Sequence, residues 1–260
     1  MFSRLYFLSV WALVYREVVR FFRQMSRVIG ALGTPLLFWF LIGSGVGTSF
    51  QSPFVPEGMS YLEFLFPGTL ALILLMTAMF SSISIIQDRQ EGFLQSILVA
   101  PVASGTLVGG KLLGGSLLSV FQALLLLLLV PFIGIPYSLS LWVYAAFGLF
   151  LFSIAMSSIS FFFAWKIPSV QGFHAVMNLL FLPLWVLSGA LFPVSAAPAW
   201  LKICMYLNPV TYGVASIRYA LNPTQLATFG SPSVTTSWVV LGVLAALGYL
   251  VDVWVVKPRR

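Results

Sequence analysis

Six stretches of the chain consist almost entirely of apolar residues, and polar residues gather in the short segments between them. Each stretch holds at least about 18 apolar residues with few charges, the length that an α-helix needs to cross the hydrocarbon core of a bilayer. The pattern predicts an all-α polytopic membrane protein with six transmembrane helices between residues 28 and 256. The stretches lie near 28–50, 64–86, 111–131, 140–164, 172–191 and 237–256.

A helix of different character is predicted before the first span, in residues 1–27. Basic and apolar residues recur there at helical spacing on opposite sides, as in amphipathic helices that lie on a membrane surface. Attraction to anionic lipid headgroups accounts for the basic side without a protein partner, so membrane lipids are its expected contact. The basic side consists of Arg16, Arg20, Arg23 and Arg27, and the apolar side of Trp11, Val14, Val18, Phe22, Met25 and Ile29.

The distribution of basic residues predicts how the chain is oriented in the membrane. Eleven of the 13 Lys and Arg fall on the side of the N-terminus, and only Lys202 and Arg218 fall on the other side. Basic residues concentrate on the cytoplasmic side of membrane proteins. Both termini, including the basic tail 257–260, are therefore expected in the cytoplasm, and the spans in the inner (cytoplasmic) membrane. The net charge of +7 follows this topology and predicts no nucleic-acid partner.

Composition excludes an ordinary soluble domain, because only 7% of the residues are charged, against about 25% in soluble proteins. The single cysteine, Cys204, and the single histidine, His174, have no neighbours at the spacing of a metal site or a catalytic dyad. Asp252 lies near the inner end of the last span, where its charge is expected to approach water or the basic tail. We expect no catalytic residue, metal or cofactor on this chain; a membrane-embedded enzyme is the alternative of another class.

The segment 88–99, between the second and third spans, is the most strongly patterned polar stretch. Its apolar residues are spaced four apart, which predicts a short amphipathic helix at the membrane surface, ended by Pro101. Asp88 and Glu91 are expected on the solvated face of this helix, because carboxylates outside a pocket do not form an acid–base pair. The apolar pairs are Phe93 with Ile97 and Leu94 with Leu98.

Residues 105–111 fit the first seven positions of a phosphate-binding loop, with the sequence Gly-Thr-Leu-Val-Gly-Gly-Lys. Leu112 follows, where such a loop needs Ser or Thr to hold Mg²⁺, and no nucleotide-binding domain fits beside the spans. The match therefore predicts no ATP site. Lys111 is instead expected to mark the cytoplasmic start of the third span.

Polar residues inside the spans are the candidates for a substrate pathway. The second and fourth spans carry hydroxyl residues on one helical face, and the third and fifth each hold one amide. Small hydroxyl residues also serve as ordinary helix-packing surface, and an interhelical hydrogen bond satisfies a buried amide equally well. Both interpretations stay open for Thr77, Ser81, Gln122, Ser153, Ser157 and Asn178.

The region 192–236 is the longest segment expected outside the cytoplasm, and it holds five prolines. Two apolar pieces within it, near 198–207 and 211–221, predict short helices. Such helices dip back into the membrane only where protein or water surrounds them. We therefore expect a re-entrant region over 192–221.

Two sets of residues carry a resemblance to a known family. Between the second and third spans stand Glu91, Gly92, Pro101, Gly110 and Lys111. Later in the chain stand Ser-Gly-Ala-Leu-Phe-Pro at 188–193, Pro-Ala-Trp at 198–200, Leu-Asn-Pro at 207–209, Tyr212 and Arg218. With six spans, this pattern resembles the permease subunit of ABC-2 type exporters over nearly the whole chain. That family has Thr after the first Gly, where this chain has Phe93.

The resemblance implies a transmembrane domain that pairs with a second copy or a close relative. It also implies separate ATP-binding cassette subunits, which hold the ATP and Mg²⁺. The segment 88–99 then corresponds to the coupling helix that contacts those subunits, and 192–221 to a lid over the exit. The implied contacts with the ATPase are Asp88, Arg89, Glu91, Gly92, Phe93, Leu94, Ile97, Leu98 and Pro101.

The nearly uncharged spans favour a hydrophobic or amphipathic substrate, such as a drug or a lipid, because nothing in them compensates an ionic cargo. A lipid-linked glycan is the alternative within the same family. A channel or carrier that works without ATP is the alternative outside it. Such carriers usually bury ionisable residues at mid-membrane, which this sequence does not place there.

Overall fold

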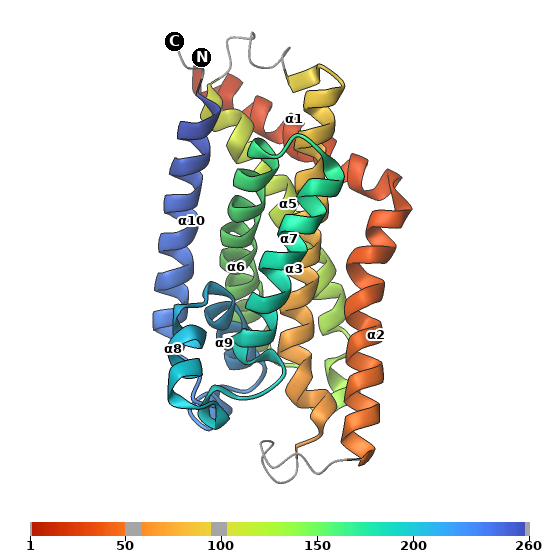
Figure 1. Cartoon of the computed structure of the whole chain (residues 1–260), viewed down its shortest axis with the longest axis vertical. Helices are drawn as coiled ribbons and strands as arrows, with labels where there is room; N and C mark the ends of the chain where they lie inside the picture. The colour runs from red at the N-terminus through yellow and green to blue at the C-terminus, as the bar shows by residue number, and fades with distance from the viewer. Residues whose placement is uncertain (1, 50–58, 95–102, 258–260) are drawn as a thin grey trace.

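The computed structural model describes residues 2–49, 59–94 and 103–257, and this part of the chain is helical without a β-strand. Six helices are long and apolar enough to cross a membrane, which confirms the predicted all-α polytopic fold. They run along the long axis of the molecule (Figure 1). These helices are α2 (Met25–Ser49), α3 (Tyr61–Gln90), α5 (Ser104–Leu127), α6 (Leu139–Lys166), α7 (Val170–Trp185) with its continuation η2 (Val186–Ala190), and α10 (Val234–Val256).

Shorter elements cover the two ends of this bundle. Helix α1 (Phe2–Arg23) crosses one end, where α10 finishes, and we call this the α1 end (Figure 1). The opposite end carries α8 (Ala199–Leu207) and α9 (Pro209–Leu221), and we call it the α9 end. The two short helices occupy the stretches where apolar pieces occur in 192–221. The 3₁₀ turns are η1 (Val130–Ile133), η3 (Val194–Ala196) and η4 (Pro223–Gln225).

Polar caps fix where most of these helices begin. The side chains of Ser60, Ser138, Ser169 and Ser233 accept hydrogen bonds from backbone N–H groups in the first turns of α3, α6, α7 and α10. Asn208 caps α9 in the same way, directly before a proline at the first helical position. Such caps satisfy backbone donors that have no partner inside the helix.

Helix α3 is the centre of the bundle. Its apolar window is 94% buried, whereas α2 and α10 stand at two edges and bury 17% each. The polar positions of α3 therefore face other helices of the same chain, and any site they form is internal.

Two boundaries differ from the hydrophobic pattern. Helix α1 ends at Arg23, and the first span begins at Met25 after a break at Gln24. Helix α5 begins at Ser104, so Lys111 lies about two turns inside the helix; that it marks the cytoplasmic start of the third span stays a prediction. The glycine-rich stretch before Lys111 is helical, and α1 packs closely against it at Gly110.

Close packing at glycine is critical between α6 and α9. A Cβ atom built on Gly213 would lie 2.5 Å from the ring of Phe152, which is itself fully buried. Gly213→Leu is expected to destabilise the protein by about 1–3 kcal/mol, the usual cost of overpacking a core. Thermal unfolding of the purified protein measures this. Gly242→Leu in α10 is the matched control, because a Cβ there meets nothing within 4 Å, and equal midpoints for the two variants would contradict the expectation.

Candidate functional site

A buried carboxylate joins three helices at the α1 end. Asp88, in the last turn of α3, is 0% exposed. Arg16 and Arg20 of α1 donate hydrogen bonds to its Oδ1 atom, with Nη–Oδ1 distances of 2.6 and 2.5 Å. Lys111 of α5 donates to Oδ2, at 2.5 Å from Nζ.

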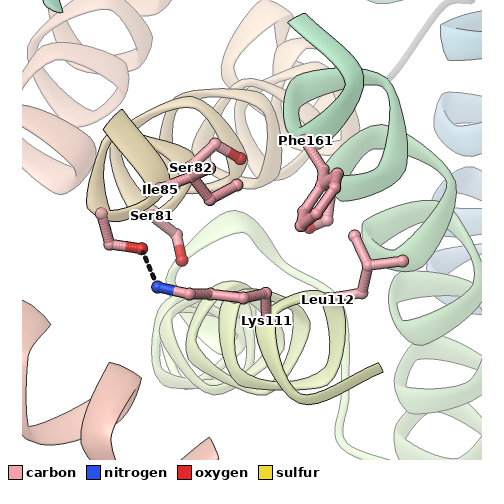
Figure 2. Close-up of a pocket in the computed structure, with 9 residues that line it drawn as sticks. Ser81, Ser82, Ile85, Lys111, Leu112 and Phe161 are labelled. Carbon is pink, nitrogen blue, oxygen red and sulfur yellow. Dashed lines mark hydrogen bonds between the residues drawn. The ribbon is translucent and has the colours of Figure 1, made fainter. Parts of the chain in front are cut away.

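Lys111 completes the site from the other side. Its ammonium also donates to Glu17 Oε1 at 2.6 Å and to Ser84 Oγ at 3.0 Å, the latter drawn as a dashed line in Figure 2. Lys111 and Glu17 are only 5% and 3% exposed. Arg20 reaches outward to Glu91, at 3.1 Å from Nη2 to Oε1. We call these six residues the charge cluster: Arg16, Glu17, Arg20, Asp88, Glu91 and Lys111.

The charge cluster is electrically balanced, with three cations and three anions. Burial alone lowers the pKa of Arg16, but the hydrogen bond and the negative charge of Asp88 outweigh it, so the pKa lies above its usual value. Buried charges are tolerated only when they are paired and hydrogen-bonded. The pairing therefore fixes the relative positions of α1, α3 and α5.

Two glycines of α5 let α1 come close enough for these contacts. A Cβ atom on Gly110 would lie 2.6 Å from Leu13 Cβ, and one on Gly114 would lie 2.9 Å from Glu17 Cβ. The Gly-Lys pair that resembles a phosphate-binding loop thus serves helix packing and a buried ion pair here.

Two expectations about charged residues were wrong. Arg16 and Arg20 face the protein interior and Asp88, whereas they were expected to contact lipid headgroups. Asp88 itself is fully buried in α3, whereas it was expected on a solvated face. The physical reason is mutual: a carboxylate and arginines that reach one another lose less free energy on leaving water than either would alone. Of the four arginines in the stripe, Arg23 is exposed.

In the described part of segment 88–99, α3 ends at Gln90, Glu91 and Gly92 form a turn, and Phe93 and Leu94 are helical. Gly92 has a φ of +76°, a conformation that glycine adopts without strain. Phe93 lies under the guanidinium of Arg16, with 3.7 Å from Cζ to the ring centroid. Glu91 has a side chain that is 60% exposed, whereas Leu94 is buried in the core of this chain. Ile97, Leu98 and Pro101 lie outside the described residues.

Leu94 and Arg89 are thus engaged within the chain and not presented to a partner. Arg89 donates to backbone carbonyls at the end of α6, the shortest contact being 2.5 Å from Nη2 to Trp165 O. Among the implied coupling residues that the structure describes, Glu91 is exposed, and Gly92 and Phe93 are half-buried. Their contact with an ATPase stays a prediction.

A line of hydroxyl groups runs from the charge cluster into the bundle, between α3, α5 and α6. Thr77 donates to Gln122 at 2.5 Å from Oγ1 to Oε1, Ser119 bonds Ser153, and Ser116 bonds Ser157. We call this the hydroxyl seam; its members are Thr77, Ser81, Ser116, Ser119, Gln122, Ser153 and Ser157.

The hydroxyl seam brings together five of the six candidate pathway residues. Beside Lys111 it contains a cavity of about 10 Å³ lined by Ser81, Leu112 and Phe161 among others (Figure 2). A cavity of this size holds about one water molecule. In this conformation the seam is therefore a packed interface, and Asn178 lies apart from it on the exposed face of α7.

Asp252 was expected to approach water or the basic tail, and the first part of this expectation was wrong; residues 258–260 of the tail lie outside the described residues. Asp252 is buried, and its Oδ2 accepts a hydrogen bond from Ser158 Oγ at 2.6 Å. Among residues 2–49, 59–94 and 103–257, no three His, Cys, Asp or Glu side chains are grouped to hold a metal ion.

Comparison with known proteins agrees with this architecture. The sequence pattern of the ABC-2 type transporter family matches residues 9–222. The chain belongs to this family. The transport permease ycf38 of Cyanophora paradoxa is 31% identical over 256 residues, covering 93% of this chain and 87% of the relative. This ABC-2 type permease is therefore a multi-pass membrane protein that functions in transport.

Two bacterial relatives extend the comparison. The inner membrane transport permease YadH of Escherichia coli K12 is 24% identical over 246 residues, covering 94% of this chain and 91% of the relative. Nodulation protein J of Rhizobium leguminosarum bv. viciae is 25% identical over 221 residues, covering 83% of this permease and 82% of the relative. The resemblance stated from sequence motifs is confirmed.

Proposed function

We propose that this permease is the transmembrane subunit of an exporter driven by separate ATP-binding cassette subunits, and that its α1 end faces the cytoplasm. The charge cluster is the observation that carries the proposal. Glu91 is the exposed member of this cluster, and it lies with the half-buried Phe93 in the segment that the family uses to contact its ATPase. A displacement of that segment by the ATPase would move Asp88 directly. Through Asp88 it would also move α1 and α5.

Such a route suits a protein that changes between two conformations. An ATPase shifts the equilibrium only if it binds the two conformations differently and a stiff element transmits the difference. Three helices held by one buried carboxylate move together, since separating any one of them leaves a buried charge without its partner. The hydroxyl seam lies directly beyond the charge cluster, so rearrangement there would open or close the path between α3, α5 and α6.

A lateral cavity supports a hydrophobic or amphipathic substrate. It has a volume of about 530 Å³ and lies between α1, α5, α6 and α10. Its walls are mostly apolar, with Phe7, Leu112, Leu113, Ile154 and Ala245 among them. Ligand pockets for drug-sized molecules fall in this range of volume and polarity. A substrate of this class would enter from the inner leaflet.

Filling the lateral cavity tests the substrate class. Leu113→Trp is expected to reduce ATP-dependent transport of a fluorescent single-chain lipid by at least about tenfold, because the larger side chain occupies the site (about 1.4 kcal/mol). Leu117→Trp, one turn further along α5 on its exposed face, is the matched control. Equal transport by the two variants, measured in sealed vesicles, would exclude this cavity as the entry site.

The class of function is tested by reconstitution. The permease, purified with an ATP-binding cassette subunit, is placed in vesicles together with the fluorescent single-chain lipid. We expect lipid movement that requires ATP and Mg²⁺ and stops without the ATPase. Movement driven by an ion gradient alone would reverse the assignment in favour of a carrier.

A further inference from the structure

The end of span five is broken, and the α9 end closes over the break. After Pro183 the helix changes to the π-helical segment η2, where Gly189 has a φ of +83°. Such breaks leave carbonyl groups without their helical partners. Asn208 Nδ2 donates to Leu184 O at 2.6 Å, and Arg218 Nη2 of α9 donates to Gly189 O at 3.1 Å.

Helix α3 contacts the same segment on the side opposite α9. Trp185 Nε1 donates to Gly68 O at 2.7 Å. A Cβ atom on Gly68 would lie 2.6 Å from Ala190 Cβ, so the two backbones are in close contact. The bent end of span five is thus held between α3 and α9.

Arg218 is an unusual residue for this position. It is 3% exposed, and its guanidinium lies between the rings of Phe64 and Phe229, with 4.8 and 4.4 Å from Cζ to the ring centroids. A guanidinium stays protonated even when it is buried, so Arg218 is charged at neutral pH. Its Nη1 group has no hydrogen-bond partner among the described residues. A buried cation held by one carbonyl and two rings is costly, and it has a spare donor.

A carboxylate lines the same cavity as Arg218. Glu63, in the first turn of α3, lines the same cavity of about 10 Å³ as Arg218, Phe64 and Phe229. No ion pair joins Glu63 to Arg218 in this structure. Glu63 instead stands at the N-terminus of α3, where Ser60 caps the helix and a negative charge is favourable.

We propose that Arg218 is the latch of the α9 end. In the state seen here it holds η2 to α9 through the Gly189 carbonyl, and on opening it transfers to Glu63 of α3. The transfer exchanges a neutral acceptor for a charged one, which offsets the hydrogen bond that opening breaks. The break at η2 provides the hinge, since helix kinks concentrate at such segments. The latch rests on the proposed transport function, because only a permease needs this end to open.

The closed state, in which Arg218 holds η2, is tested without any ATPase. In a Cys204→Ala background, Ser188→Cys places a thiol in buried η2, and a membrane-impermeant maleimide added outside reports opening. Arg218→Met should raise the labelling rate by at least about tenfold, the effect of losing a hydrogen bond from a charged group. Arg218→Lys, which keeps the charge without the forked donor, should fall between. Lys202→Met in α8 removes the same charge and should label like the parent.

Labelling of Arg218→Met and Arg218→Lys at the parent rate would overturn the latch, even if the permease proved to transport nothing. The second half is tested by Glu63→Gln. Labelling at rest should stay at the parent rate, while ATP-dependent lipid transport should fall at least about fivefold, because the charged acceptor of the open state is lost. Normal transport by Glu63→Gln in a complex whose parent is active would refute the transfer step.

Discussion

Lys111→Met should lower the unfolding midpoint of the purified permease strongly. The change leaves Glu17 and Asp88 buried while it removes the ammonium that both of them share. Breaking a buried ion pair on one side costs about 3–5 kcal/mol, because the remaining charge stays in a medium of low polarity. Thermal unfolding in lipid nanodiscs, followed by tryptophan fluorescence, measures the shift.

The double variant Glu17→Gln/Lys111→Met separates the ion pair from simple loss of packing. Removing the orphaned carboxylate should recover part of the midpoint, whereas two independent effects would add. Lys166→Met is the control, because Lys166 is exposed at the end of α6. If Lys111→Met and Lys166→Met unfold together, the charge cluster contributes no stability.

The spans were predictable because the bilayer imposes one requirement on each of them separately. A helix of about 20 apolar residues is recognised without knowing its neighbours. The pattern at 64–86 therefore located α3, and the one at 237–256 located α10. The short helices α8 and α9 were also predictable, since prolines at 198 and 209 separate two apolar pieces.

The charge cluster was not predictable because its contacts are long-range. Asp88 is separated from Arg16 by 72 positions in the chain and from Lys111 by 23. An arginine stripe on an amphipathic helix is the same in sequence whether it faces lipid headgroups or a buried carboxylate. The feature of the sequence that indicated a buried carboxylate was Asp88 itself. It is a charged residue at the end of an apolar run, and Lys111 follows after the segment that connects the two spans.

The candidate pathway residues likewise were predictable in their local spacing but not in their long-range contacts. Helical spacing placed Thr77 and Ser81 on one face, and Ser153 and Ser157 on another, and the structure brings these faces together. Spacing could not say whether the space between them is open. Asn178 has no such periodic companion, and the structure leaves it on the outer face of α7, away from the others.

Stability and coupling place different demands on the charge cluster. Asp88 and Lys111 are buried and serve to hold helices together, so their loss affects the fold before it affects transport. Leu94 belongs to the same group, because a polar residue there would enter the core. A variant that tests coupling alone must lie on the surface of the cluster, and Glu91 meets that condition.

Glu91→Arg should uncouple ATP hydrolysis from transport while the permease stays folded. The new arginine lies beside Arg20 and close to Arg16, so the turn after α3 is repelled from α1. The turn after α3 then no longer transmits the movement of the ATPase to Asp88. In the reconstituted complex, ATP hydrolysis should continue, and lipid transport should fall by at least about tenfold, a loss of about 1.4 kcal/mol in the coupling between the two sites.

A second-site change decides where the contact of Glu91 matters. If its partner is Arg20 of the same chain, Arg20→Gln/Glu91→Arg should restore much of the lost transport, because the repulsion between the two arginines is removed while Arg16 and Lys111 still pair with Asp88. If Glu91 instead binds a cation on the ATPase, the double variant stays uncoupled, and an acidic replacement on that subunit restores transport. Glu91→Gln, which removes the charge without repulsion, should show a smaller loss than Glu91→Arg. Full transport by Glu91→Arg itself, at normal expression and with ATP hydrolysis intact, would mean that the turn after α3 does not couple the ATPase to this permease.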